Sequence, residues 1–142
     1  MQPFFNKRRN AIYTLKHWTR FQGQPNAYFR REGVRVTLGP RGDIYLNLKA
    51  GEAIGRPEAV DLLFDWGRRV IGLIPAKPWV PNSFPVRLKF RGNGHVIHAS
   101  PFCVHFLIKP QRTVIFNEVQ IDDQGIMSLP LDSITAVTRG SK

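Results

Sequence analysis

Hydrophobic and polar residues alternate most clearly in the segment Val34–Leu38. Every second residue there is apolar, and Arg35 and Thr37 take the positions between. This period of two predicts a half-buried strand. A spacing of three and four follows and predicts a short helix, ended by Gly55 and Pro57. The predicted elements of this first module are strands at 34–38 and 44–46 joined by a turn at 39–42, a helix carrying Ala50, Ala53 and Ile54, and strands at 60–64 and 70–74 joined by a hairpin turn at 65–68.

The same order returns about 52 residues later in the chain. Val86–Phe90 repeats the alternation of the first strand, with Arg87 and Lys89 at the polar positions. Ser100 and Pro101 predict the start of a helix, with the serine as its cap. The other elements predicted for this second module are a turn at 91–94, a strand at 95–97, a helix with Phe102 and Phe106 four residues apart, strands at 113–116 with Val119 and Ile121 and at 126–129, and a turn at 122–125.

These patterns predict a mainly β protein with short helices, built from two ββαββ repeats. A unit of roughly 45 residues with one short helix buries too little apolar surface to be stable alone, so the two repeats are expected to share one core. Four prolines in residues 75–85 favour a stiff, extended connection. The expected parts are an N-terminal arm at 1–33, a first repeat at 34–76, a Pro-rich linker at 77–85, a second repeat at 86–131, and a polar tail at 132–142 with a possible short strand at 134–137.

The charge of the chain adds a clue to function. The sequence has 21 Lys and Arg but only 10 Asp and Glu, which gives a net charge of +11 and a pI near 10.7. Such a field attracts DNA, RNA or an anionic membrane surface, although it can also serve solubility alone. No apolar run approaches the roughly 20 residues of a membrane span, and the start lacks the apolar segment of a secretory signal. The single cysteine, Cys103, favours a reducing, cytoplasmic location. Because the N-terminal residues are basic and poor in acids, a transit peptide stays an alternative.

The N-terminal arm combines seven Lys or Arg with one acid and many aromatic residues. Aromatic side chains beside cations can stack on exposed bases while the cations hold phosphate, or they can pack the arm on a core. Both interpretations stay open at this point. The residues spaced by four, three and four, which share one face of a helix that residues 8–21 could form, are Arg9, Tyr13, Lys16 and Arg20.

Six segments carry a family pattern: Gly42–Leu46, Lys49–Gly55 and Arg69–Pro75 in the first copy, and Gly94–Ile97, Ser100–Ile108 and Gly125–Pro130 in the second. Their order resembles the swapped-hairpin DNA-binding fold of the AbrB, MazE and MraZ proteins over about Val34 to Leu131. In that family two units interlock their hairpins into one barrel-like core, usually as a dimer. Two units in tandem are similar to the MraZ arrangement. The resemblance therefore implies a pseudo-dimeric barrel and DNA binding of the transcription-regulator type.

The chain departs from this family at positions that usually carry proline or basic residues. Asn47 and Ala99 replace the usual proline before the helix, and Asp43 and His95 replace the basic residue after the turn glycine. Only the basic residues of the two first strands match in both copies. The helix positions that are often basic in the family are here Gly51, Glu52, Cys103 and Val104.

Four potential metal ligands lie within eleven residues of one another: His95, His98, Cys103 and His105. Residues three apart on a strand, or two apart on a helix, do not share a face, so these side chains should not converge on zinc. A cysteine in the middle of an apolar helix is usually inert. No P-loop, G-x-S-x-G or H-E-x-x-H motif is present. We therefore expect no metal, no cofactor and no enzymatic activity.

The favoured function is double-stranded DNA binding through cations on equivalent strands and turns, with the arm following the phosphate backbone. The first alternative is an RNA or single-strand binder within a ribonucleoprotein. The second is an antitoxin-like or structural subunit that docks a protein partner through the arm, as a pseudo-dimeric monomer or a homo-oligomer. The predicted nucleic-acid-binding residues are Arg35, Arg87 and Lys89 on strands, Arg41 and Arg91 in turns, and Arg8, Arg9, Lys16, Arg20, Arg30 and Arg31 in the arm.

Overall fold

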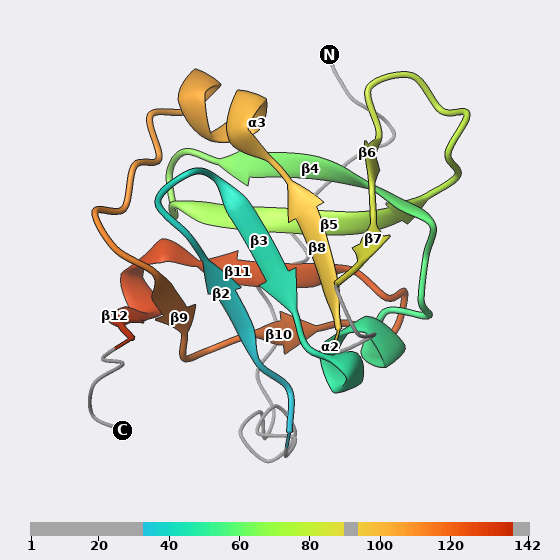
Figure 1. Ribbon diagram of the computed structural model, residues 1–142, viewed down its shortest axis with the longest axis horizontal. Helices are drawn as coiled ribbons and strands as arrows, with labels where there is room; N and C mark the ends of the chain where they lie inside the picture. The colour runs from blue at the N-terminus through green and yellow to red at the C-terminus, as the bar shows by residue number, and fades with distance from the viewer. Residues whose placement is uncertain (1–32, 90–93, 138–142) are drawn as a thin grey trace. The chain divides into compact units, whose positions relative to one another are not determined.

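Two antiparallel β-sheets and two short helices make up the part of the chain that the computed structural model describes, residues 33–89 and 94–137. These residues belong to one compact unit, Glu32–Lys142. The prediction of a mainly β fold with short helices is confirmed. Within the described residues the strands form two open sheets and no closed barrel. Figure 1 shows strands of one sheet crossing in front of strands of the other.

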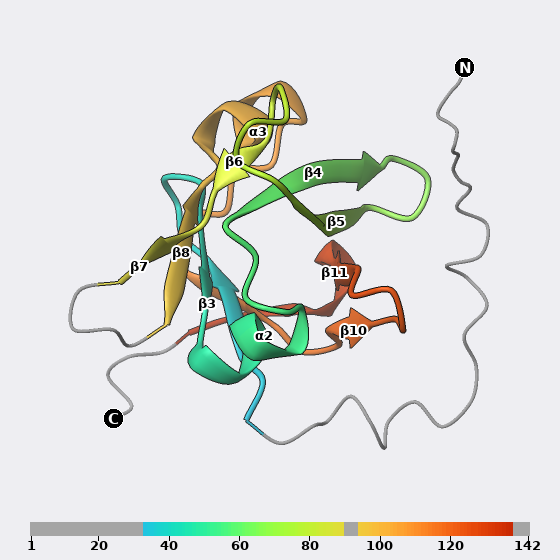
Figure 2. The same cartoon turned by 90° about the vertical axis from the view of Figure 1, so that its right-hand side faces the viewer.

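The first sheet has the order β12-β9-β2-β3-β8-β7, with β2 (Val36–Leu38), β3 (Asp43–Leu46), β7 (Arg87–Leu88), β8 (His95–His98), β9 (Val114–Phe116) and β12 (Ile134–Ala136). The second sheet has the order β10-β11-β5-β4-β6, with β4 (Ala59–Asp65), β5 (Val70–Ala76), β6 (Phe84–Pro85), β10 (Gln120–Ile121) and β11 (Met127–Pro130). The helices are α2 (Leu48–Ala53) and α3 (Ser100–His105), and the 3-10 turn η3 (Leu131–Ser133) precedes β12. Figure 2 shows the two helices at opposite ends of the sheets.

Helix α2 has the start and stop that its sequence predicts. The side-chain oxygen of Asn47 accepts a hydrogen bond from the Ala50 amide at 2.9 Å, which satisfies a free amide of the first turn. At the other end the amides of Gly55 and Arg56 donate to carbonyls of the last turn in a Schellman arrangement. The predicted stop at Gly55 is therefore confirmed.

Helix α3 starts one residue earlier than predicted. Its N-cap is Ala99, which makes no side-chain capping bond, and Ser100 is already helical, so the predicted serine cap is wrong. Pro101 lies in the first turn, where its missing amide leaves no hydrogen bond unmade. Phe102 and Cys103 are buried and anchor the helix on the core.

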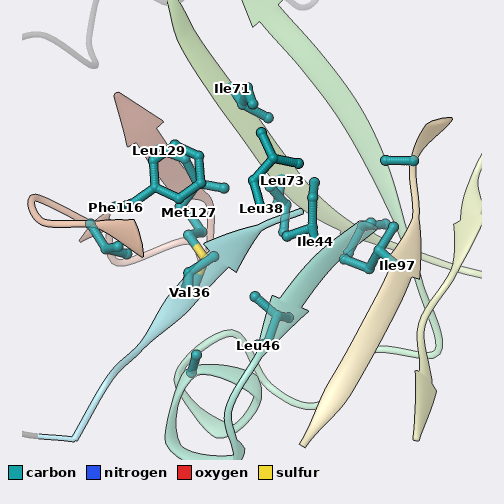
Figure 3. Close-up of a cluster of buried hydrophobic side chains, with 14 of the residues drawn as sticks. Val36, Leu38, Ile44, Leu46, Ile71, Leu73, Ile97, Phe116, Met127 and Leu129 are labelled. Carbon is teal, nitrogen blue, oxygen red and sulfur yellow. The ribbon is translucent and has the colours of Figure 1, made fainter. Parts of the chain in front are cut away.

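Three antiparallel pairs join the halves of the chain: β2 with β9 and β3 with β8 in the first sheet, and β5 with β11 in the second. In the first sheet β3 pairs with β8, so that Ile44 lies opposite Ile97. In the second sheet β5 pairs with β11, so that Leu73 lies opposite Met127. All four side chains are fully buried. Figure 3 shows side chains of both sheets meeting in one core between the sheets, so neither half has a core of its own.

Strand β7 and the linker differ from the prediction. Leu88 lies on the core-facing side of β7 but is 69% exposed, because this short edge strand extends past the core. The expected burial of the apolar positions in 86–90 is therefore wrong at Leu88. The linker was expected to be extended, yet it turns twice between Lys77 and Ser83, and Phe84–Pro85 pairs back onto β4. It thus forms the edge of the second sheet instead of a spacer.

The expected polar tail contributes to the first sheet. Its start lies in η3, and β12 pairs with β9, so the short strand at 134–137 is confirmed. The helix considered for 8–21, the arm cations and the turn that carries Arg91 lie outside the described residues. In the ranges 33–89 and 94–137 no helix is long and apolar enough to span a membrane.

Candidate nucleic-acid interface

The outer face of the first sheet collects cations from strands that are distant in sequence. Arg87 lies opposite Val96, which in turn lies opposite Tyr45. Tyr45 also lies opposite Thr37, and Arg35 is two residues before Thr37. Side chains directly opposite one another, or two apart on one strand, point to the same side of a sheet. Arg35 and Arg87 therefore lie on the same face as Tyr45. Lys89 is two residues beyond Arg87, so it lies on this face too.

An open cleft of about 380 Å³ on this face brings Arg35 and Lys89 together around Tyr45. The Lys89 amine lies 4.9 Å from the centre of the Tyr45 ring, a cation–π contact that holds the amine over the sheet. Asn47 fixes the backbone at Arg35, whose amide donates to the Asn47 side-chain oxygen at 3.1 Å. The backbone N–H of Asn47 donates to the Arg35 carbonyl at 3.1 Å. The cleft thus combines two cations with an aromatic ring.

The opposite end of the same face has a different charge. Arg41 lies in the turn before β3, and the Asp43 carboxylate bonds the His98 ring at 2.9 Å. Burial, and then the charge and hydrogen bond of Asp43, raise the pKa of the Tyr45 hydroxyl, while Arg41 acts against this shift. Tyr45 is therefore neutral at physiological pH. The face is cationic at the cleft and mixed in charge at the Asp43 end.

Tyr45 and Asn47 are two of the cleft residues that were not among the predicted site residues. Tyr45 alternates with the buried Ile44 and Leu46, so the period of two already places it on the polar face. Asn47 stands directly before a helix, where asparagine is a common cap. Both signals were present in the sequence, but the cleft they form depends on the register of β2 and β3 and on the position of Lys89.

The described part of the protein is nearly neutral. It holds eleven Lys or Arg and nine Asp or Glu, a net charge of +2. The rest of the +11 belongs to residues 1–32, 90–93 and 138–142. The predicted cations Arg8, Arg9, Lys16, Arg20, Arg30, Arg31 and Arg91 lie in these segments. The cluster at the cleft is therefore a local feature of the sheet and does not follow from a uniformly basic surface.

No group of three or more His, Cys, Asp or Glu that could hold a metal occurs in the described residues. His95 instead packs against α2, because a Cβ built at Gly51 would lie 2.7 Å from the His95 ring. His105 contacts the ring of Phe106. Cys103 is buried, and burial, followed by the nearby Asp43 carboxylate, raises the pKa of its thiol to about 11. A thiol in this state is a poor nucleophile and a poor metal ligand near neutral pH.

Because the pKa of the Cys103 thiol is raised in the folded protein, the free energy of unfolding should fall as the pH becomes alkaline. The folded-state pKa of about 11 lies above the ordinary value of 9.0, so the thiol's contribution is complete below about pH 9 and is lost as the pH rises through 11. We expect the wild type to lose about 2 kcal/mol more than Cys103→Ala across this range. Urea unfolding of both proteins at several pH values measures this difference in the free energy of unfolding. Parallel pH profiles of the two proteins would contradict a raised pKa at Cys103.

No family model matches the chain, and no match was found among curated proteins or solved structures. The function is therefore inferred from the geometry and the charge of the site.

Proposed function

We propose that this is a non-enzymatic, cytoplasmic nucleic-acid-binding protein that contacts double-stranded DNA and acts as a transcription regulator. The observation that carries the proposal is the gathering of Arg35, Arg87 and Lys89 on one face of the first sheet. Each phosphate neutralised by such a cation releases a counterion, which drives binding at low salt. The seven cations of the arm supply further phosphate contacts.

The finer fold that we propose is an AbrB-like, swapped-hairpin pseudo-dimer of the repeats 34–76 and 86–131. Strands β3 and β8 start 52 residues apart and pair with each other in the first sheet. Gly42 and Gly94 are also 52 residues apart. A Cβ at Gly42 would lie 2.7 Å from Ser100 Cα, and one at Gly94 would lie 3.1 Å from Asn47 Cα, so each turn touches the other half's helix start. These reciprocal contacts support an interlocked pair of repeats.

Removing two cations of the cleft should weaken DNA binding and its salt dependence together. We expect Arg35→Ala/Lys89→Ala to lower duplex affinity at least about tenfold at low salt, and to reduce the slope of log K against log salt by about 1.8 for two phosphate contacts. Fluorescence anisotropy of one labelled duplex at several salt concentrations measures both. The matched control is Lys77→Ala/Lys109→Ala, which removes two exposed cations away from the cleft and should change affinity less than about threefold.

The same titration separates the second candidate, an RNA or single-strand binder. It is favoured by the Tyr45 ring within a cationic cleft, since aromatic rings beside cations stack on unpaired bases. Under that function Tyr45→Leu should weaken a single-stranded oligonucleotide about tenfold and leave the duplex unchanged. Failure of all three labelled ligands, duplex, single strand and RNA, to bind at low salt would exclude both candidates.

A further inference from the structure

An unusual residue ends helix α3. Leu107 has φ +58, a left-handed conformation that glycine adopts easily and leucine does not. The hydrogen bonds at this end match those that end α2, because the amides of Leu107 and Ile108 donate to the carbonyls of Val104 and Cys103. The residue 52 positions earlier is Gly55, the expected glycine, at φ +87. The Leu107 side chain is 71% exposed, so packing in the core does not compensate for its strained backbone.

Leu107 belongs to an exposed apolar surface that we name the α3 patch, made of Trp66, Val104, Phe106 and Leu107. Trp66, in the turn between β4 and β5, is 58% exposed and its ring lies 5.4 Å from that of Phe106. Val104 is 62% exposed and lies in the last turn of α3, three residues before Leu107 in the sequence. In both views α3 lies beside the β4–β5 end of the second sheet (Figures 1 and 2).

The base of the α3 patch is rigid. Phe64 of β4 contacts Trp66 at 5.2 Å and Phe106 at 5.0 Å between ring centres, and Phe102 contacts Phe106 at 4.9 Å. These rings attach the patch to the core, because Phe102 is buried and Phe64 packs against the buried cluster. Large apolar side chains held in place by such packing bind a partner with little loss of side-chain entropy.

The segments that carry the α3 patch have an excess of positive charge. Residues 65–69 and 104–112 contain four Lys or Arg and one acid, Asp65. Asp65 already accepts hydrogen bonds from the backbone and side chain of Arg68. An apolar surface with cations at its rim complements a segment that has bulky apolar side chains flanked by carboxylates.

We infer that the α3 patch docks an acidic segment of a protein partner, with large apolar residues seated on Trp66 and Leu107. A second copy of this chain is disfavoured, because two chains of +11 repel each other. Stacked bases fit less well, because Trp66 is the one largely exposed ring of the patch, while Val104 and Leu107 offer no ring for stacking. The patch is separate from the cationic cleft, so a protein partner and a nucleic acid can bind the same molecule.

The test selects a ligand from random linear peptides of about 16 residues, roughly four helical turns, displayed on phage. The full-length protein is the bait, and Trp66→Ala/Leu107→Gly, which has the same charge, removes peptides held by charge alone. We expect the enriched peptides to be acidic with bulky apolar residues. As synthetic, labelled peptides they should bind Leu107→Gly at least about tenfold more weakly than the wild type, a loss typical of an interface anchor.

Two controls keep this result separate from a failure to fold. Leu107→Gly should raise the Tm by about 3 °C, because glycine relieves the strained φ, so lost binding cannot come from unfolding. Trp79→Ala removes a tryptophan that is more exposed than Trp66, 77% against 58%, in the loop before β6, and should leave peptide affinity within about twofold.

Several outcomes overturn the inference. They are no enrichment, enriched peptides without acidic residues, equal binding to wild type and Leu107→Gly, and a lower Tm for Leu107→Gly. A tenfold loss of single-stranded oligonucleotide binding in the same variant would reassign the α3 patch to nucleic acid. A wild-type dimer that dissociates on Leu107→Gly, measured by sedimentation, would reassign it to a second copy of the chain.

Discussion

Replacing Gly94 with alanine should lower the free energy of unfolding by about 3 to 5 kcal/mol, or prevent folding altogether. The backbone at Gly94 has φ +116, outside the regions that residues with a side chain normally adopt. A Cβ there would lie 2.5 Å from the Leu46 carbonyl oxygen and 3.1 Å from the Asn47 Cα. Both contacts are with backbone, which cannot rotate away as a side chain could. The conformational strain and the overlap therefore add.

Gly42 and Gly55 complete this experiment. Gly42→Ala should have a similar effect, since Gly42 has φ +91 and its Cβ would lie 2.7 Å from the Ser100 Cα. Gly55→Ala is the matched control, because Gly55 has φ +87 but no atom lies within 4 Å of its Cβ. It should cost only about 1 kcal/mol for the φ angle. Urea unfolding followed by circular dichroism measures all three, and equal losses would show that close approach adds nothing.

Truncating Leu73 to alanine should lower the free energy of unfolding by about 3 to 4 kcal/mol. Leu73 is fully buried on β5 and lies opposite Met127 of β11. Figure 3 shows its side chain directed toward Leu38 and Ile44 of the first sheet. Its removal therefore opens a cavity where both sheets and both halves of the chain meet.

Leu88→Ala is the control for Leu73→Ala, because it makes the same chemical change on the exposed edge strand β7. Its effect should stay within about 0.5 kcal/mol. Denaturant midpoints of both variants, with unchanged slopes, provide the comparison. If Leu73→Ala costs no more than Leu88→Ala, the core does not lie at the junction of the sheets.

These two results bear on the proposed fold as well as on stability. The glycine turns are the places where each half touches the other half's helix start, and Leu73 lies where β5 pairs with β11. A loss at both places is expected if the halves unfold together, as an interlocked pseudo-dimer requires. The cleft variants described above leave these contacts intact, so loss of binding and loss of folding can be told apart.

Local structure was predictable from the sequence because local patterns encode it. The strand predicted within Val34–Leu38 and the helix stop at Gly55 each depend on residues close together in the chain, and both appear in the structure. The strand is limited to Val36–Leu38, and Thr37 is buried with its neighbours, so the predicted half-burial is wrong there. Two other predictions failed for different reasons. Helix α3 begins at Ser100, one residue earlier than predicted, so Ser100 is helical and Ala99 is the cap. Leu88 is exposed because the core does not extend as far as the edge strand, which the alternation of residues along one strand does not reveal.

The sequence by itself determined the β-rich class, the order of the elements, the polar positions that carry Arg35 and Arg87, and the excess of positive charge. Only the tertiary structure decided that β3 pairs with β8, that the linker returns to β4, and that Tyr45 and Lys89 meet across one cleft. The physical reason is that a period of two specifies which face a side chain takes. Which strand lies beside it is decided by burial and hydrogen bonding across about fifty residues of intervening chain.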